Sequence, residues 1–218
     1  MKKNSLKYFF LLFALPFLFS CERDLETEGI SRITNYPVFN MPGDQFLSVE
    51  VGGTFNDPGV TATEGGAEIP VTKTGDVVDT STPGVYIMNY TATNKDGYSA
   101  STTRYVGVIA PDAAAADLSG NYKRNAGVFG VSKVTKVGVG HYTTDNVGGV
   151  AVGGPATSLH FYHTTGNTLV GPEQNNGTGV FEVVDATYSP AAGATPASYT
   201  WTVINPGYGN APRTFVKQ

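Results

Sequence analysis

The sequence predicts an all-β protein, an immunoglobulin-like β-sandwich followed by a second antiparallel β-sandwich or flattened barrel. Two observations predict this class. Apolar and polar residues alternate with period two in several short segments, which is typical of strands with one buried face. The composition also favours strands and turns over helices, because Gly, Pro, Thr and Tyr are frequent (27 Gly, 13 Pro and 12 Tyr in 218 residues) and Leu and Lys are few.

Residues 1–20 have the features of a bacterial lipoprotein signal peptide. Three lysines precede an apolar run over residues 8–19, which is too short to span a bilayer comfortably. The run ends in Leu-Phe-Ser-Cys at 18–21, which resembles a lipobox. The resemblance implies cleavage before Cys21 and acylation of its thiol and new amino terminus, an anchor in which each buried methylene contributes about 0.8 kcal/mol. An ordinary cleaved signal with a stray cysteine is the alternative.

Cys21 is the only cysteine, so the folded part has no disulfide and depends on burial of apolar surface. Without Lys2, Lys3 and Lys7, 11 basic and 18 acidic residues remain, a net charge of −7. This balance argues against nucleic acid as a partner, because binding it needs basic patches that neutralise phosphates.

Residues 21–32 are polar and acidic without periodicity, which predicts a disordered tether after the lipidated cysteine. An acidic patch at this place resembles the export signal of surface-exposed lipoproteins in some Gram-negative anaerobes. It implies a lipid-anchored protein of the outer membrane that faces the cell surface. A plain acidic linker, and the periplasmic face, are the alternatives.

Residues 33–110 carry the pattern of a small sandwich. Strands are expected at 46–51, 60–63, 69–72, 85–93 and 98–109. Even positions from 86 to 92 are Tyr, Met, Tyr and Ala, and they share one face of a strand. Short strands at this spacing, with Pro-Gly and Asp-Gly turns between them, predict a β-sandwich.

Two motifs in this segment are F-x-D-P-G-V-x-A at 55–62 and V-D-T-x-x-P-G-x-Y-x-x-x-Y-x-A at 78–92, followed by Arg104. They resemble the bacterial surface immunoglobulin-like domain, a cadherin-related repeat that usually serves as a spacer. In that pattern Ala92 stands where antibody domains carry a disulfide cysteine. Some relatives bind calcium, but Thr63 stands where they often carry Asp, so no metal is expected.

Residues 111–117 are expected to form a linker, because Pro111 and the following Leu-Ser-Gly oppose a helix over the four alanines at 113–116. Residues 118–218 again have a β pattern. Strands are expected at 128–139, 157–163, 180–184 and 198–205.

The motifs L-S-G-x-Y at 118–122, Y-x-x-D-x-x-G-G at 142–149 and W-x-V-x-N-P-G-Y-G at 201–209 resemble a second family. It is the uncharacterised C-terminal domain that accompanies the immunoglobulin-like domain in gut-type Gram-negative lipoproteins. The resemblance implies a place beside outer-membrane glycan-uptake systems, and it implies no activity.

The sequence offers little catalytic chemistry. His160 and His163 are three residues apart on an expected strand and therefore point to opposite faces, which argues against a shared metal ion. No Gly-x-Ser-x-Gly elbow occurs, and the only cysteine is assigned to the lipid anchor. We expect no enzyme, no metal and no cofactor. Asp145 and Glu173 are the carboxylates that a hydrolase would require to meet across loops.

The expected ligand-binding surface lies in the second domain. Pro206-Gly207 and Gly209 place Tyr208 in a loop, where its ring is available to stack on a sugar. The other candidates for this surface are Tyr142, Asp145, Asn175 and Trp201. For Trp201, on a regular strand, burial in the core is the alternative.

These observations predict a noncatalytic accessory lipoprotein that binds glycan or another polymer beside an outer-membrane uptake system. Its expected partners are the membrane, through Cys21, and polysaccharide or uptake-system proteins. The first alternative is a structural, adhesion or assembly module that binds another envelope protein. The second is a hydrolase.

Overall fold

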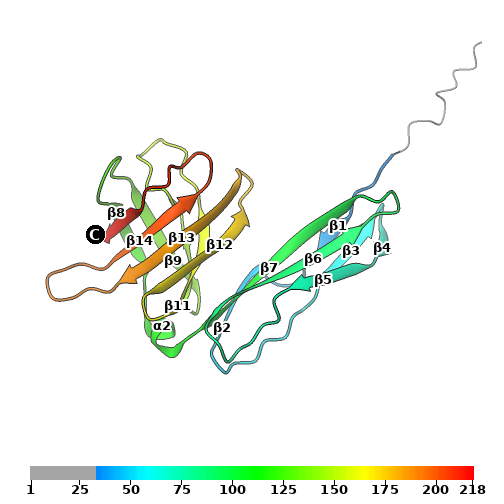
Figure 1. Cartoon of the computed structure of the whole chain (residues 1–218), viewed down its shortest axis with the longest axis horizontal. Helices are drawn as coiled ribbons and strands as arrows, with labels where there is room; N and C mark the ends of the chain where they lie inside the picture. Colours follow the sequence, from blue (N-terminus) through cyan, green and yellow to red (C-terminus); the bar gives the residue numbers. More distant parts are fainter. Residues whose placement is uncertain (1–32) are drawn as a thin grey trace, which may run out of the picture. The chain divides into compact units, whose positions relative to one another are not determined.

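The computed structural model describes residues 33–218 (Figure 1). The predicted signal peptide, the lipidation of Cys21 and the acidic tether fall on residues 1–32 and lie outside the described residues. Residues 36–218 form one compact unit. The described residues form fifteen strands and one five-residue helix, so the predicted all-β class is confirmed. No helix in this part of the chain is long and apolar enough to cross a membrane.

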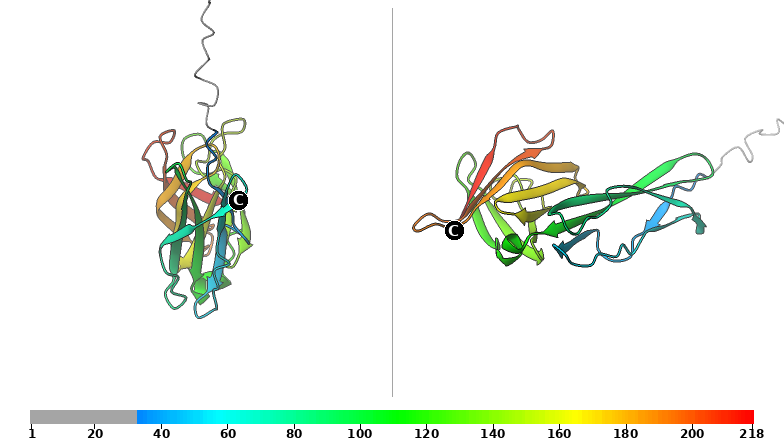
Figure 2. Two further views of the ribbon diagram at one scale, coloured as in Figure 1. Left: turned by 90° about the vertical axis from the view of Figure 1, so that its right-hand side faces the viewer. Right: turned by 60° about the horizontal axis from the view of Figure 1, so that its bottom comes forward.

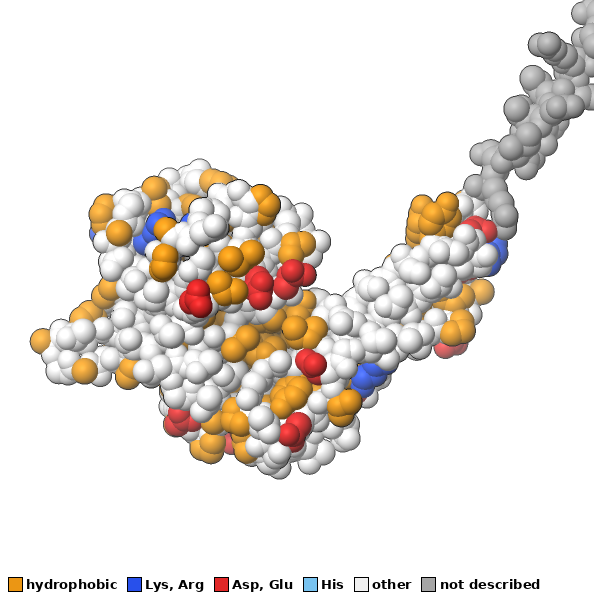
Figure 3. Space-filling model, in the orientation of Figure 1, with side chains coloured by type: hydrophobic (Ala, Val, Ile, Leu, Met, Phe, Trp, Pro, Cys, Tyr) orange, Lys and Arg blue, Asp and Glu red, His pale blue; other side chains and the backbone are white. Residues whose placement is uncertain are grey.

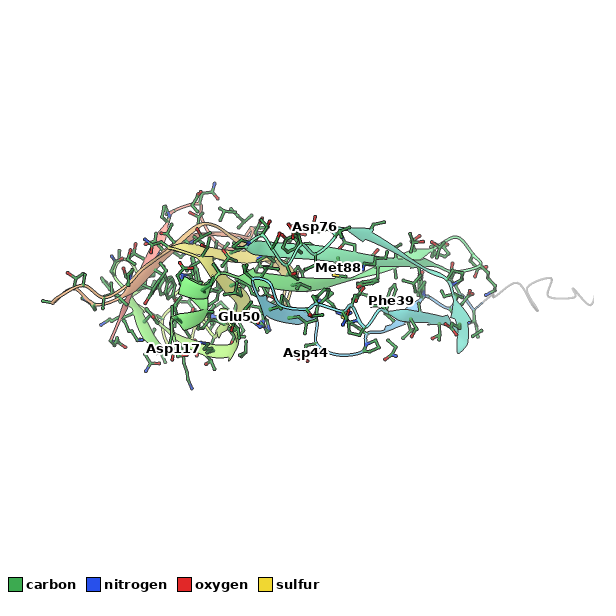
Figure 4. The ribbon with its side chains drawn as sticks, turned by 90° about the horizontal axis from the view of Figure 1, so that it is seen from below. Phe39, Asp44, Glu50, Asp76, Met88 and Asp117 are labelled. Carbon is green, nitrogen blue, oxygen red and sulfur yellow. The ribbon has the colours of Figure 1, made fainter. Side chains whose placement is uncertain are left out.

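The N-terminal strands form two sheets. The strands are β1 (Val38–Asn40), β2 (Phe46–Glu50), β3 (Thr61–Glu64), β4 (Ala67–Ile69), β5 (Val71–Gly75), β6 (Gly84–Thr93) and β7 (Ser99–Ile109). One sheet has the order β1-β3-β4, and the other has the order β2-β7-β6-β5 with β2 parallel to β7. The core between them includes Met88 of β6, labelled in Figure 4, and Tyr90. Both are buried, and they share a face of β6 as the period-two pattern predicted.

One expected strand is divided in the structure. The segment 69–72 was predicted as a single strand, but β4 and β5 lie in different sheets with Pro70 between them. Pro70 has no backbone N–H to donate to a sheet ladder, so the chain leaves one sheet and enters the other at this residue.

An ion pair crosses the core of this sandwich. The Arg104 guanidinium is fully buried and donates to Asp57 Oδ1 at 2.5 Å. Asp57 Oδ2 accepts hydrogen bonds from Tyr90 Oη at 2.7 Å and Lys73 Nζ at 2.8 Å, and Oδ1 also accepts the Gly59 N–H. Partial burial raises the pKa of Asp57, but the hydrogen bonds from these partners outweigh it and hold that pKa well below its usual range. The residues that carried the family resemblance therefore build a charged network.

The segment between the two β domains contains a short helix, α2 (Pro111–Ala115), where the sequence favoured a connector without one. Pro111 occupies the first turn, where a backbone N–H has no helical partner to lose, and its fixed φ suits the start of a helix. The helix therefore begins at Pro111 and includes the first three alanines, and it ends before Ala116, whose backbone is extended.

The C-terminal strands close into a barrel. They are β8 (Gly120–Arg124), β9 (Val131–Gly138), β10 (His141–Thr144), β11 (Leu159–Thr165), β12 (Thr168–Asn175), β13 (Val180–Ser189), β14 (Ser198–Ile204) and β15 (Arg213–Lys217). Each strand pairs antiparallel with the next, and β15 pairs with β8 to complete the ring, seen from two further directions in Figure 2. Of the two predicted architectures, the structure has the barrel.

Aromatic side chains fill the interior of this barrel. The centroid of the Tyr199 ring lies 4.4 Å from that of Trp201 and 4.8 Å from that of Phe215, and all three residues are buried. An eight-stranded barrel has an interior just wide enough for side chains to fill, so any ligand site is expected at an end of the barrel. The other buried aromatic residues of this core are Tyr122, Tyr142, Phe161, Phe181 and Tyr188.

Side-chain contacts also join β2 and β7 to the barrel within the compact unit. Phe46 stacks on Tyr105 at 4.7 Å and on His160 at 4.0 Å between centroids. Tyr105 Oη donates to the Glu173 carbonyl at 2.5 Å. His160 Nδ1 lies 2.9 Å from His141 Nε2, and burial lowers the pKa of both rings, that of His141 to about 4 with His160 as a second cause.

Candidate functional site

Four loops at one end of the barrel enclose a cleft. In an up-and-down barrel alternate connections lie at the same end, and these four are 125–130, 145–158, 176–179 and 205–212, together at the top of the barrel in Figure 1. The cleft has a volume of about 410 Å³. All four loops or the strand ends beside them contribute to its lining, which comprises Arg124, Val128, Gly148, Val150, Pro155, Thr157, Thr178, Phe181, Gly207, Tyr208, Gly209 and Arg213.

The buried core holds one wall of this cleft in place. Trp201 Nε1 donates to the Val147 carbonyl at 2.9 Å, and Val147 directly precedes Gly148 of the lining. Asn146, also buried, donates through its side-chain amide to Val131 and Val150 carbonyls and accepts the Val150 N–H. These bonds tie the long 145–158 loop to the barrel, so the cleft has a supported wall.

Tyr208 packs at the mouth against this wall. A turn places it, because the Tyr208 N–H donates to the Asn205 carbonyl at 2.9 Å and the Gly207 N–H to Asn205 Oδ1 at 2.8 Å. Its ring meets Phe181 edge-on at 5.9 Å between centroids, and it lies so close to Gly148 that a Cβ there would overlap it. The Tyr208 hydroxyl is buried without a hydrogen-bond partner among the described residues.

Two arginines stand at the same mouth. Arg124 pairs across strands with Phe215, and Arg213 pairs with Trp201. Arg124 donates to the Gly148 carbonyl at 3.3 Å. The Arg213 guanidinium lies 5.3 Å from the centre of the Tyr208 ring.

Arg213 also braces the loop before it. Its guanidinium donates to the Ala211 carbonyl at 3.1 Å and the Gly209 carbonyl at 3.2 Å. Burial lowers the pKa of Arg213, and the nearby charge of Arg124 lowers it further.

This lining can bind but has few groups for catalysis. It offers aromatic rings, two guanidinium groups and the hydroxyls of Thr157 and Thr178, and it contains no Asp, Glu, His or Cys. In Figure 3 the blue atoms at the upper left of the barrel lie among uncharged surface. Within residues 33–218 no group of three or more His, Cys, Asp or Glu side chains is placed to hold a metal ion.

Of the five residues predicted for a binding surface, Tyr208 lines this cleft. Tyr142 and Trp201 are core residues with no exposed surface. Their polar atoms are used internally, since Tyr142 Oη donates to the Ala116 carbonyl at 3.0 Å and the Trp201 indole holds Val147. A ligand therefore cannot reach either ring, because both lie on the inner face of their strands.

Asp145 and Asn175 are exposed but do not line the cleft. Asp145 Oδ1 accepts the Lys133 N–H at 2.7 Å, which links the end of β10 to β9, and Asn175 Oδ1 accepts the Gly177 N–H at 2.9 Å within a local turn. Glu173 is likewise outside the lining. His160 and His163 lie in separate contacts, the first with His141 and the second with the Gly166 carbonyl.

The structure adds residues to the site that the motifs did not single out, above all Arg124, Arg213 and Phe181. A signal for the two arginines exists in the sequence. Arg124 is two residues after Tyr122 and Arg213 is two before Phe215, so each shares the inward face of an aromatic residue on a strand. A charged residue in phase with a buried face needs a partner, and without an internal ion pair such as that of Arg104 it indicates a candidate site.

Comparison with known proteins finds a family that matches the N-terminal sandwich. Residues 39–108 match the family described as bacterial surface protein, Ig-like domain. A solved lipoprotein from Bacteroides thetaiotaomicron is 25% identical, with a TM-score of 0.38, and the match covers 84% of this chain and 100% of that one. No curated protein matches the chain. The Ig-like match indicates a location in the bacterial cell envelope.

Proposed function

We propose that this protein is a lipid-anchored, noncatalytic envelope protein whose barrel mouth binds a saccharide. The observation that carries the proposal is the cleft of about 410 Å³, within the usual volume range of small-molecule sites. The Ig-like family match supports a surface location. The sandwich would then serve as the spacer between the anchor at Cys21 and the barrel, beside an outer-membrane uptake system.

The lining suits a saccharide because it combines two kinds of group. Phe181 and Tyr208 supply apolar ring surface, which can pack against the CH faces of a sugar. Arg124, Arg213 and the threonine hydroxyls supply hydrogen-bond donors that converge on the same space. With no carboxylate in the lining, the cleft lacks the acid pair that glycoside hydrolysis uses.

The proposal is tested by titrating the chain from Glu22 onward, which includes the whole compact unit, against a broad glycan panel. Tyr208→Ala should weaken binding at least about tenfold, since it removes an aromatic wall worth about 1.5 kcal/mol or more. Tyr98→Ala is the matched control, because Tyr98 is 51% exposed on the sandwich and far from the lining in sequence. If the unaltered protein binds no glycan of the panel, the proposal fails.

A protein partner is the second candidate, and exposed apolar side chains at the loop tips favour it. Phe129 is 55% exposed next to exposed Val128 on the 125–130 loop. Exposed apolar side chains that lie together often mark a contact with another protein. Co-purification from membranes with Phe129→Ser as the comparison tests it. A stoichiometric partner that depends on Phe129, together with no glycan affinity, would favour this candidate over the first.

A further inference from the structure

We propose that the saccharide bound at the barrel mouth is acidic, and that its carboxylate or sulfate group sits against the guanidinium groups of Arg124 and Arg213. This inference rests on the proposed function and adds the chemical class of the ligand. It follows from the position of the two arginines, from their unused hydrogen-bonding capacity and from the balance of charge around them.

The two arginines occupy inward positions at the end of the barrel. Residues 122 and 124 of β8 share a face, as do residues 213 and 215 of β15, and the faces that carry Tyr122 and Phe215 form the barrel core. Beyond this aromatic layer the next inward positions carry positive charge. Arginine is almost never fully buried unless it is paired, so the buried Arg213, with the half-buried Arg124 beside it, requires a partner for its charge.

The hydrogen bonds of Arg213 are incomplete. Its side chain is 7% exposed, yet it makes two hydrogen bonds, both to carbonyls of its own loop, and its Nε–H has no partner among the described residues. The adjoining Tyr208 hydroxyl is also buried without a partner. A buried donor left unpaired costs free energy, so these groups define the atoms that a bound acceptor would satisfy.

Arg104 shows what a buried arginine looks like in this chain when its charge is balanced internally. Its Nε–H also lacks a partner, but its charge is neutralised by the ion pair with Asp57. In the part of the chain that the structure describes, neither Arg124 nor Arg213 forms such a pair. The cleft therefore holds two positive charges with no acidic residue in its lining.

A bound oxyanion supplies the negative charge and the hydrogen-bond acceptors that the two arginines lack. A carboxylate or sulfate accepts from guanidinium N–H groups in a planar, two-bond geometry, and its negative charge removes the repulsion between the two cations. The cleft is larger than a bare anion needs, and its Phe181 and Tyr208 walls fit the sugar ring that would carry the charged group. A uronic acid or a sulfated sugar has both parts.

The test compares carboxylated and sulfated oligosaccharides with their carboxyl-reduced or desulfated counterparts, and with inorganic sulfate, by calorimetry on the chain from Glu22 onward. We expect an acidic oligosaccharide to bind at least about tenfold more tightly than its neutral counterpart and than sulfate. Arg124→Gln and Arg213→Gln should each weaken it about ten- to a hundredfold, the range for loss of a charge-assisted hydrogen bond.

Lys123→Gln is the matched control. It removes one positive charge from the neighbouring residue of β8, which is exposed and outside the lining, so binding should change less than twofold. The fluorescence of the buried Trp201 shows whether each variant folds. If Arg213→Gln does not fold, Arg124→Gln alone tests the proposal, because Arg124 is only half-buried.

The outcomes separate this inference from the function on which it rests. Equal binding of acidic and neutral saccharides would overturn the acidic class and leave saccharide binding in place. No binding of any saccharide would overturn both. Sulfate binding as tightly as the oligosaccharides would refute a saccharide ligand, and an equal effect of Lys123→Gln and Arg124→Gln would reduce the site to general charge attraction.

Discussion

Asp57→Ala should be among the most destabilising single changes in the sandwich. The Asp57 carboxylate accepts hydrogen bonds from Arg104, Tyr90, Lys73 and the Gly59 N–H, all between 2.5 and 3.0 Å. Its removal leaves the Arg104 guanidinium fully buried with no negative partner. Breaking a buried ion pair by removing one partner costs about 3–5 kcal/mol, because the remaining charge is desolvated and uncompensated.

Two further variants separate this effect from the loss of hydrogen bonds alone. Lys73→Met removes the other cation that pairs with Asp57. Because the Lys73 side chain is 48% exposed, this change should lower the free energy of unfolding by at most about 1 kcal/mol. Asp57→Ala combined with Arg104→Met removes both buried charges, so the double variant should be more stable than Asp57→Ala alone.

Urea unfolding followed by far-UV circular dichroism measures these free energies, while the fluorescence of Trp201, the only tryptophan, reports on the barrel separately. The reasoning would be refuted if the two substitutions in the double variant simply added, or if Lys73→Met cost as much as Asp57→Ala. In either case the buried charge of Arg104 would have no special energetic role.

Three further predictions concern other parts of the chain. Cys21→Ala should move the protein from the membrane fraction to the soluble fraction, and retention in membranes would refute the lipid anchor. The pKa of His141, about 4 in the fold against 6.5 unfolded, means that the unfolded chain takes up protons first as pH falls. The contribution of His141 to the free energy of unfolding should therefore be fully present above about pH 6.5 and should decline towards pH 4 by at most about 3 kcal/mol. Urea unfolding at several pH values should show a flatter pH profile for His141→Gln. Equal slopes for the variant and the unaltered protein would refute this assignment. Gly148→Ala should displace the Tyr208 ring, lower stability by about 1–3 kcal/mol in thermal unfolding and weaken ligand binding. Gly209→Ala, with open space around the added methyl group, should leave stability unchanged, and an equal loss of stability in the two variants would contradict the packing argument.

Local patterns predicted β6 and β7 of the sandwich best, because these two strands are long and regular. The alternation from residue 85 to 93 identified β6 and the residues that share each of its faces, and the turn at 94–97 identified the hairpin to β7. In the barrel four strands were not anticipated, β8, β10, β12 and β15. β10 has only four residues, too few to show a clear alternation. β12 contains Gly171-Pro172, and this pair argues against a strand in the sequence. The structure accommodates it through register shifts on both sides of Gly171.

The candidate site was predicted only in part because a loop position can be recognised locally, whereas burial cannot. Pro206, Gly207 and Gly209 mark Tyr208 as a loop residue, and Tyr208 lines the cleft. Trp201 and Tyr142 have the composition of a binding surface but lie inside the closed barrel. The position of a ring on a strand says which neighbours share its face, and it does not say whether that face is the inner one.

The sequence by itself determined the all-β class and the turn positions, because strand alternation and turn chemistry depend on neighbouring residues. Only the tertiary structure decided that the second domain is a closed barrel, since closure depends on the pairing of β15 with β8, which are distant in sequence. That same pairing brings Arg124 and Arg213 to one mouth beside Tyr208. Long-range strand pairing, which no local pattern encodes, therefore creates the site.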